Sequence, residues 1–293
     1  MSLTGSIDGV LDPVRLRVLV AVARTGSLTA AAKELHYAQP SVSHHLARLE
    51  AETGAKLLQR VGRGVRLTDA GRLLAERAAE ILGRLDSAAA ELEALIQLRA
   101  GRVRLAAFPS AMGTFVPEAG IRLAEAYPGV ELHIVEAEPP EALNMIRSGE
   151  ADVAVVFGYG PGEEPDIRTR HLFDDPGHLV HLDGPTLKDH KDGQWIAGCE
   201  RCRRHLLDIC AQEGFTPNIT FTTDDYVAVQ AMVAAGLGVA LLPSLALRAH
   251  RHPKVRTAEL PGSIRHVYAA TYGAPPDPPA TLALLEALSK PLA

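Results

Sequence analysis

Cysteine, aromatic residues and long apolar runs are all scarce in this 293-residue chain. Its three cysteines, Cys199, Cys202 and Cys210, are odd in number and clustered, unlike the paired framework of a small secreted domain. No run of 18 or more apolar residues occurs, so no transmembrane helix is expected. The first ten residues hold neither a basic cluster nor a long apolar segment, which is not the pattern of a secretory signal. These absences predict a cytoplasmic protein with free thiols.

Motifs of the common enzyme classes are also missing. There is no G-x-S-x-G nucleophile elbow, no P-loop and no H-E-x-x-H zinc motif. The adjacent carboxylates Asp174 and Asp175 fall in a segment rich in proline and glycine, which predicts a loop rather than a positioned acid/base pair. We therefore expect no catalytic activity, no bound metal and no cofactor.

The net charge of -5 conceals an asymmetry along the chain. Residues 1–66 carry nine basic against five acidic residues, or +4, and the remainder carries 21 against 30, or -9. A polyanion such as DNA is therefore attracted to the N-terminal part and repelled by the rest.

Three short amphipathic helices are predicted before residue 51. Apolar residues recur at helical spacing in each, Ser27 is placed to cap the second helix, and Pro40 suits the first turn of a third that ends near Glu50. Their buried faces are expected to be Leu16, Leu19, Val20 and Ala23 in the first helix, Leu28, Ala31, Ala32 and Leu35 in the second, and Val42, Leu46 and Leu49 in the third.

A basic hairpin is predicted directly after these helices, from Leu57 to Leu67. Its three arginines alternate with apolar residues around a Gly62–Gly64 turn, the pattern of a two-stranded wing. The exposed face of the third helix carries short hydroxyls, His44 and Arg48, which suit base edges and phosphates. A polar face on an isolated helix is usually only solvated, but this order of helices and wing favours DNA binding.

A long helix is predicted from Thr68 to about residue 100. Its apolar residues recur at intervals of four and three residues in turn, which is a heptad pattern. A helix with this pattern usually packs against a second helix. The predicted dimerisation residues are Leu74, Ala78, Ile81, Leu85, Leu92 and Leu95.

From Gly101 onward, strands and helices alternate, which indicates βαβ units and a mostly parallel sheet. Strands are expected at 103–107, 131–136, 152–157, 179–182, 195–197, 219–222, 239–242 and 267–271, and helices near 115–127, 141–148, 203–213 and 226–235.

The segment from Leu16 to Gly71 resembles the DNA-binding domain of LysR-type transcriptional regulators, with Leu58 where phenylalanine is the common choice. The resemblance implies a winged helix-turn-helix at 1–67, a linker helix at 68–100 and an effector domain at 101–293. That domain is expected to be periplasmic-binding-protein-like, with two Rossmann-like lobes at about 101–168 with 266–293 and at about 169–265. A transport binding protein shares the second fold but carries no helix-turn-helix.

The resemblance also implies partners: a palindromic promoter site in double-stranded DNA, a small-molecule effector, RNA polymerase, and the chain itself as a homodimer or homotetramer. Carried over by position, the DNA-binding residues are Gln39, Pro40, Ser41, Ser43, His44 and Arg48 for the major groove, and Arg63 or Arg66 for the minor groove or backbone.

The effector is expected between the lobes, at the carboxyl ends of the strands, where helix N-termini favour anions. Ser110 is the preferred hydrogen-bond donor to the effector, with helix capping as the alternative for Ser110 and Thr222. Asp224 is expected to cap Val227 or to oppose an anionic ligand. The predicted effector-binding residues are Ser110, Ala111, Phe157, Gly158, Gly198, Thr222 and Thr223.

The cysteine cluster is the one feature that suggests other chemistry. Together with His205 it offers four zinc ligands, but a helix from Arg203 onward directs Cys210 away from Cys199. A peroxide-sensing branch of this family resembles the chain in carrying two reactive cysteines here, and neighbouring arginines lower a thiol pKa. Redox sensing through Cys199, Cys202 and Cys210 is therefore the alternative function, beside simple packing of small apolar side chains.

Overall fold

A computed structural model describes residues 11–61, 64–97, 101–160 and 166–290. The chain divides into two compact units, an N-terminal one up to Gln97 and a C-terminal one that holds nearly all of the rest.

The N-terminal unit is a helix-turn-helix with a short β-hairpin and a long helix, as predicted. Its elements are α1 (Pro13–Thr25), α2 (Leu28–Glu34), α3 (Gln39–Thr53), β1 (Leu58–Val61), β2 (Gly64–Leu67) and α4 (Asp69–Gln97). Ser27 caps α2 by accepting a hydrogen bond from the Ala30 amide, as expected. Gly26 takes a positive φ of 64° and ends α1, a conformation that glycine adopts without steric cost.

A single apolar core joins these elements. Leu16, Leu19, Val42 and Leu49 are almost fully buried in it, in agreement with the predicted helix faces. Ala31 and Ala32 are also buried, so α2 packs closely against its neighbours.

Glu50 fastens the hairpin to α3. Its carboxylate accepts hydrogen bonds from the Leu57 and Leu58 amides, at 2.9 and 3.2 Å, and from the Lys56 ammonium at 2.8 Å. Burial acts to raise the pKa of Glu50, but these three donors outweigh it and hold the pKa below its ordinary value. Thr68 then caps α4 through the Gly71 amide.

The predicted dimerisation residues of α4 lie in two different environments. Leu74 and Ala78 pack into the core of the N-terminal unit, and Ala78 is 0% exposed, so it is already used within the chain. Ile81, Leu85 and Leu92 remain 39%, 47% and 57% exposed. The backbone of Leu95 is helical, but its side chain lies outside the described residues.

The C-terminal unit is an α/β domain built on one eight-stranded sheet in the order β4-β3-β5-β10-β6-β9-β7-β8. Its strands are β3 (Arg102–Ala107), β4 (Glu131–Glu136), β5 (Val153–Gly158), β6 (Ile167–His181), β7 (Gln194–Ala197), β8 (Asn218–Thr222), β9 (Val239–Pro243) and β10 (Arg256–Tyr272). Its helices are α5 (Pro109–Met112), α6 (Phe115–Ala126), α7 (Pro139–Arg147), the short η1 (Leu187–His190), α8 (Glu200–Gln212), α9 (Tyr226–Ala234), α10 (Ser244–Ala249) and α11 (Pro279–Leu288).

The sheet is mixed, which corrects the expectation of a mostly parallel one. β3 pairs in parallel with β4 and β5, and β7 with β8 and β9, whereas β10 pairs antiparallel with β5 and β6, and β6 with β9. The long strands β6 and β10 thus join two parallel halves into one sheet. Asp174 and Asp175 lie within β6, so the expectation of a loop there is wrong.

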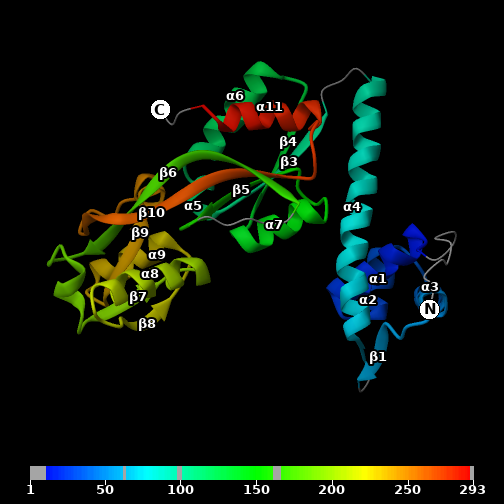
Figure 1. Cartoon of the computed structure of the whole chain (residues 1–293), viewed down its shortest axis with the longest axis horizontal. Coiled ribbons are helices and arrows are strands. Elements are labelled where there is room, and N and C mark those ends of the chain that lie inside the picture. The colour runs from blue at the N-terminus through cyan, green and yellow to red at the C-terminus, as the bar shows by residue number, and fades with distance from the viewer. Residues whose placement is uncertain (1–10, 62–63, 98–100, 161–165, 291–293) are drawn as a thin grey trace. The chain divides into compact units, whose positions relative to one another are not determined.

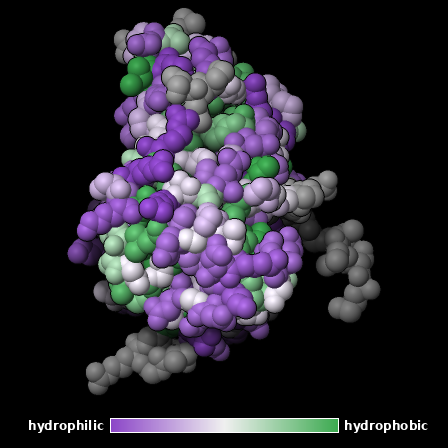
Figure 2. All heavy atoms as spheres, turned by 90° about the vertical axis from the view of Figure 1, so that its left-hand side faces the viewer, coloured by the Kyte–Doolittle hydropathy of each residue, from purple (hydrophilic) through white to green (hydrophobic). Residues whose placement is uncertain are grey.

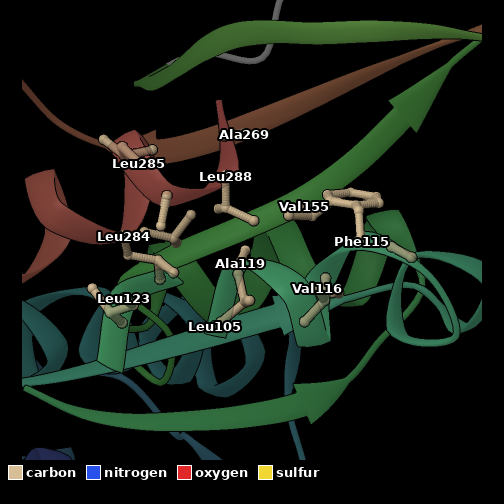
Figure 3. Packing of buried hydrophobic residues seen from close by; sticks show 14 of the residues in the cluster. Leu105, Phe115, Val116, Ala119, Leu123, Val155, Ala269, Leu284, Leu285 and Leu288 are labelled. Carbon is tan, nitrogen blue, oxygen red and sulfur yellow. The ribbon is translucent and has the colours of Figure 1, made fainter. Parts of the chain in front are cut away.

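Helices cover the parallel halves of the sheet. In the half that contains β3 and β5, α6 and α11 pack their apolar faces over the strands, and Phe115, Leu123, Leu284 and Leu288 are at most 2% exposed (Figure 3). The other half has its own clusters, one of them around Trp195.

Hydrophilic side chains cover most of the face in Figure 2, with small apolar islands between them. Among the helices of the described residues, none is both long and apolar enough to cross a membrane.

Candidate functional site

The exposed face of α3 carries most of the predicted DNA-binding residues. Gln39, Pro40, Ser41, His44 and Arg48 are all exposed, while Val42, Leu46 and Leu49 anchor the opposite face of the helix. Ser43 is half-buried, and its hydroxyl accepts a hydrogen bond from the Gln39 amide at 3.2 Å.

Arginines flank this helix face. The Arg48 side chain is 58% exposed and lies 3.7 Å from Glu52, an ion pair too open to immobilise it. Arg66 is exposed on β2 of the wing, whereas Arg63 lies outside the described residues. The surface offers hydroxyl, amide, imidazole and guanidinium groups on a rigid helix, the set that reads base edges and phosphates.

A pocket in the C-terminal unit lies where the ends of β3 and β5 meet those of β7 and β8. Ser110, Phe157, Gly198 and Thr223 line it, and these four are predicted effector-binding residues. Ala111, Gly158 and Thr222 are not part of its lining. The pocket has a cavity volume of about 60 Å³.

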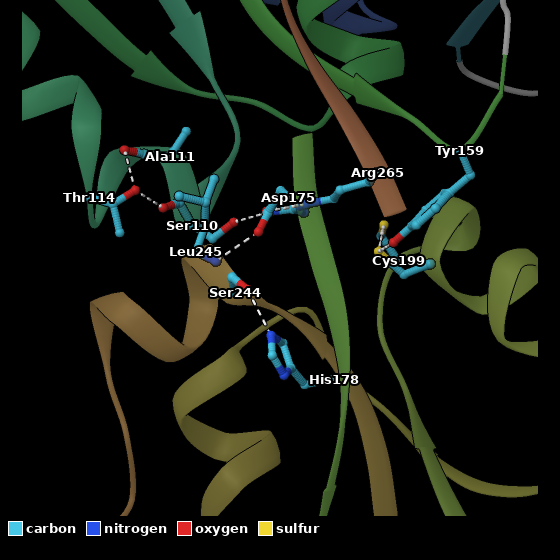
Figure 4. A network of polar contacts seen from close by, with 11 residues as sticks. Ser110, Ala111, Thr114, Tyr159, Asp175, His178, Cys199, Ser244, Leu245 and Arg265 are labelled. Atoms are coloured by element: carbon cyan, nitrogen blue, oxygen red, sulfur yellow. Dashed lines mark hydrogen bonds and ion pairs between the residues drawn. The ribbon is translucent and has the colours of Figure 1, made fainter. Parts of the chain in front are cut away.

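A buried arginine organises the pocket wall (Figure 4). The Arg265 guanidinium, on β10, donates from Nε to Asp175 Oδ2 on β6 and from Nη2 to Ser110 Oγ, both at 2.7 Å. It also lies 4.8 and 4.5 Å from the ring centres of Phe108 and Phe157. Ser110 is therefore held in the pocket by Arg265, and its oxygen does not cap a helix.

Asp175 completes this network. Its second oxygen accepts a hydrogen bond from the Leu245 amide at 3.0 Å, at the start of α10. The side chains of Arg265 and Asp175 are only 4% and 1% exposed. Sequence reasoning missed both residues, because their meeting depends on the register of two strands 90 positions apart and leaves no local signal.

Two acidic residues share the pocket lining. Burial, followed by the nearby Cys199 and Asp224, raises the pKa of Glu138 from 4.5 to about 8. One Glu138 oxygen is buried without a hydrogen-bond partner among the described residues. Asp225, and not Asp224, caps α9 by accepting from the Val227 and Ala228 amides, so the expected Asp224 cap is wrong.

Two of the three cysteines also line the pocket. Cys199 is the N-cap residue of α8 and Cys202 lies one turn later, which brings their Sγ atoms to 3.2 Å. The Tyr159 hydroxyl donates to Cys202 Sγ at 3.7 Å. The hydrogen bond from Cys199 lowers the pKa of Cys202, and the Arg265 charge lowers it further, although burial acts in the opposite direction. The same hydrogen bond, together with burial, raises the pKa of Cys199.

The other members of the cysteine cluster point elsewhere. Cys210 is fully buried in the core around Trp195 and Leu206, whereas Cys199 and Cys202 pack against the core of the first half of the sheet. His205 stacks on the Tyr159 ring at 3.8 Å and contacts Ser263. The four side chains therefore do not converge into the zinc site that their spacing suggests, because helix α8 turns Cys210 away.

Comparison with known proteins assigns both units. Residues 14–72 match the bacterial regulatory helix-turn-helix protein family of the lysR type, and residues 97–292 match the LysR substrate binding domain. An uncharacterised HTH-type transcriptional regulator of Shigella flexneri, YfeR, is 30% identical over 80% of this chain and 78% of its own length. The hydrogen peroxide-inducible genes activator of Dickeya chrysanthemi is 30% identical over 80% of each chain.

Solved structures share the fold over most of the chain. CbnR, a LysR family transcriptional regulator, superposes with a TM-score of 0.68 at 21% identity, covering 95% of this chain and 98% of its own. CbnR has also been solved in complex with its target DNA, and that structure matches with a TM-score of 0.65 at 21% identity.

Proposed function

Because the chain belongs to the LysR family of DNA-binding transcriptional regulators with an effector-binding domain, we propose that it binds a palindromic promoter site as an oligomer in the cytoplasm. In this proposal α3 enters the major groove, the wing contacts the backbone or minor groove, and a small molecule in the pocket changes the arrangement of the DNA-binding units. RNA polymerase is the expected further partner.

The exposed face of α3 is the observation that carries the DNA-binding role. Its polar residues project from a helix whose other face is locked in a core, so their positions are fixed before DNA arrives. The exposed apolar stripe of Ile81, Leu85 and Leu92 on α4 supports pairing with a second chain.

A mobility-shift assay on DNA upstream of its own gene tests this role. The double variant His44→Ala/Arg48→Ala should lose about 30-fold or more in specific affinity, since each base contact contributes about 1–3 kcal/mol. Arg204→Ala is the matched control, because this arginine is 70% exposed in the C-terminal unit. An unchanged shift for the double variant, or no specific binding by the parent protein at moderate salt, contradicts the proposal.

We further propose that the effector is neutral rather than anionic. The Arg265 charge is already matched by Asp175, and the pocket lining includes Glu138 and Asp224. With a pKa of about 8, Glu138 is mostly protonated at neutral pH and presents a hydrogen-bond donor. A carboxylate ligand would add negative charge to a pocket that has no spare positive charge from Arg265.

Thermal shift with small carboxylates and their matching primary amides tests the ligand class. Amides should raise the unfolding temperature more than carboxylates, and Ser110→Ala should reduce that gain. Thr222→Ala is the control, because Thr222 is exposed and outside the pocket lining. Stronger stabilisation by the carboxylates, or equal damage from the control variant, argues against a neutral effector in this pocket.

Redox sensing is a second candidate function, favoured by the 3.2 Å Cys199–Cys202 contact. The Cys202 thiolate would attack a hydroperoxide, releasing an alcohol or water and leaving a sulfenic acid. The Cys199 thiol would then displace water from that sulfur to form a disulfide. The expected pair thus differs from one that involves Cys210, which is buried in another core.

Thiol counting after mild peroxide treatment tests this second function. Of the three cysteines, one free thiol should remain in the parent protein and none in Cys210→Ser. Cys199→Ser and Cys202→Ser should form no intramolecular disulfide. A disulfide that still forms in either of these two variants would show that Cys199 and Cys202 are not the reacting pair. Three free thiols in the treated parent protein would rule out redox sensing and leave metabolite sensing as the function.

A further inference from the structure

A cluster of two histidines and one aspartate lies on the long strands β6 and β10. His171 Nε2 and His266 Nδ1 both lie 2.7 Å from Asp174 Oδ1. The three ligand atoms are all within 4.8 Å of one another, and among the described residues no other group of histidine, cysteine and carboxylate side chains is as close. Neither the proposed DNA-binding surface nor the pocket includes any of these residues.

The strand geometry brings these side chains to one face. Asp174 is directly opposite His266 across the antiparallel pair, and His171 is opposite Tyr268. A β-bulge lies between these two positions, because Phe173 faces Val267 and the register then shifts past Leu172. Without the bulge, residues 171 and 174 would point to opposite faces of the strand, since their separation is odd.

The chemistry of the cluster suits a metal ion. Asp174 supplies a carboxylate oxygen, and His171 and His266 each supply an imidazole nitrogen that lies 2.7 Å from it. The side chains of His171, Asp174 and His266 are 50%, 51% and 35% exposed, which leaves the open side of the cluster accessible to solvent.

We propose that His171, Asp174 and His266 bind a divalent transition-metal ion such as Zn²⁺, with water completing the coordination. Two imidazoles and one carboxylate favour this class of ion over Mg²⁺ and Ca²⁺, which prefer oxygen ligands. Bonds of about 2.0–2.2 Å in a tetrahedral site separate the ligand atoms by about 3.3 Å. The two 2.7 Å contacts therefore need to lengthen by about half an ångström, and the two histidine nitrogens, which lie within 4.8 Å of each other, need to reach the same separation.

The site lies directly behind the pocket wall. Along β10, Arg265 points into the pocket and His266 to the other face, and along β6 Asp175 and Asp174 alternate in the same way. A bound ion would cross-link β6 to β10 beside the buried Arg265–Asp175 pair and stabilise this part of the sheet.

Titration of tag-free, metal-stripped full-length protein tests the site. Zn²⁺ binding is measured by calorimetry, and Co²⁺ binding by its electronic spectrum, in a Cys199→Ser/Cys202→Ser background that excludes thiolate ligation. One ion per chain should bind, with no thiolate charge-transfer band. Since loss of even an outer-shell partner weakens metal sites by about 10–100-fold, His171→Ala and His266→Ala should weaken binding by about 100-fold or more.

His133→Ala is the matched control, because His133 is 53% exposed on β4 and contacts Glu131 at 2.9 Å. It should bind the ion as the parent does. Zn²⁺ should raise the unfolding temperature of the parent and of His133→Ala, but not that of the ligand variants. Asp174→Asn is the second ligand variant in case a histidine variant fails to fold. No saturable binding by the parent, undiminished binding by the ligand variants, or equal loss in the control would overturn the proposal.

Discussion

The Arg265–Asp175 pair predicts a large and specific loss of stability in Asp175→Asn. Both side chains are almost fully buried, and the carboxylate accepts from Arg265 Nε at 2.7 Å and from the Leu245 amide at 3.0 Å. Asparagine has a single carbonyl oxygen, so its NH₂ group must face either the guanidinium or the Leu245 amide, and both of these are donors. The substitution therefore leaves a buried positive charge without its counter-ion.

Breaking a buried pair in this way costs about 3–5 kcal/mol of the free energy of unfolding. The adjacent residue provides the control, because Asp174 is 51% exposed and its contacts are to two half-exposed histidines. Asp174→Asn should therefore cost about 0–1 kcal/mol. The double variant Asp175→Leu/Arg265→Met should recover much of the loss, because it removes both charges together.

Urea unfolding followed by tryptophan fluorescence measures this difference in the full-length protein. The chain has one tryptophan, and Trp195 is 0% exposed in a core of the C-terminal unit. Its signal therefore reports the unfolding of the unit that contains the pair. A chelator keeps metal binding from affecting the control. A loss of less than about 1 kcal/mol for Asp175→Asn, or an equal loss for the control, would refute the assignment of Arg265 as a charge neutralised by Asp175.

Three further predictions follow from the same structure. The pKa of Glu138 is raised from 4.5 to about 8 in the folded protein, so the stability associated with its proton is fully present below pH 4.5 and is lost as the pH rises through about 8. Glu138→Gln, which cannot ionise, should flatten the decline in the free energy of unfolding, followed by Trp195 fluorescence, between these two pH values. Leu85→Glu should reduce the oligomer in sedimentation, whereas Leu73→Glu, at a 58% exposed position of α4 outside the stripe, should leave it unchanged; equal effects would remove the stripe from the interface. Glu50→Ala should cost the N-terminal unit about 1–3 kcal/mol in thermal unfolding by stranding the Leu57 and Leu58 amides, and Glu34→Ala, which breaks an exposed pair with Arg24, much less.

The N-terminal unit was predictable because its determinants are local. Helix spacing identified Val42, Leu46 and Leu49 as buried, and Ser27 caps α2 as its position suggested. The heptad pattern of α4 was equally visible, but the sequence did not show which of its residues pack within the chain and which stay exposed. Whether Ala78 packs against its own core or a second chain depends on where the neighbouring helices end, and spacing along one helix holds no such information.

The long strands of the C-terminal unit were only partly predictable. The sequence suggested a strand at 179–182, whereas β6 spans Ile167–His181. Its first half carries exposed polar residues, and Pro176 and Gly177 in its middle are typical of turns. They are tolerated because the pairing of β6 with β10 is irregular here, between Glu259–His178 and Ile264–Pro176, and the pairing of β6 with β9 begins only at Gly177.

The register of β6 against β10 explains why the pocket residues escaped prediction and why they are nevertheless well determined. Successive side chains on a strand face opposite ways, so a slip of one residue would exchange Arg265 with His266. Arg265 would then lose Asp175, Ser110 and the two phenylalanine rings together, and a histidine would face the pocket in its place. Since a buried unpaired charge is among the costliest features of a folded protein, the pair selects one register over its neighbours. The same register sets Asp174 beside His266 on the other face, so the pocket wall and the proposed metal site are consequences of a single strand alignment.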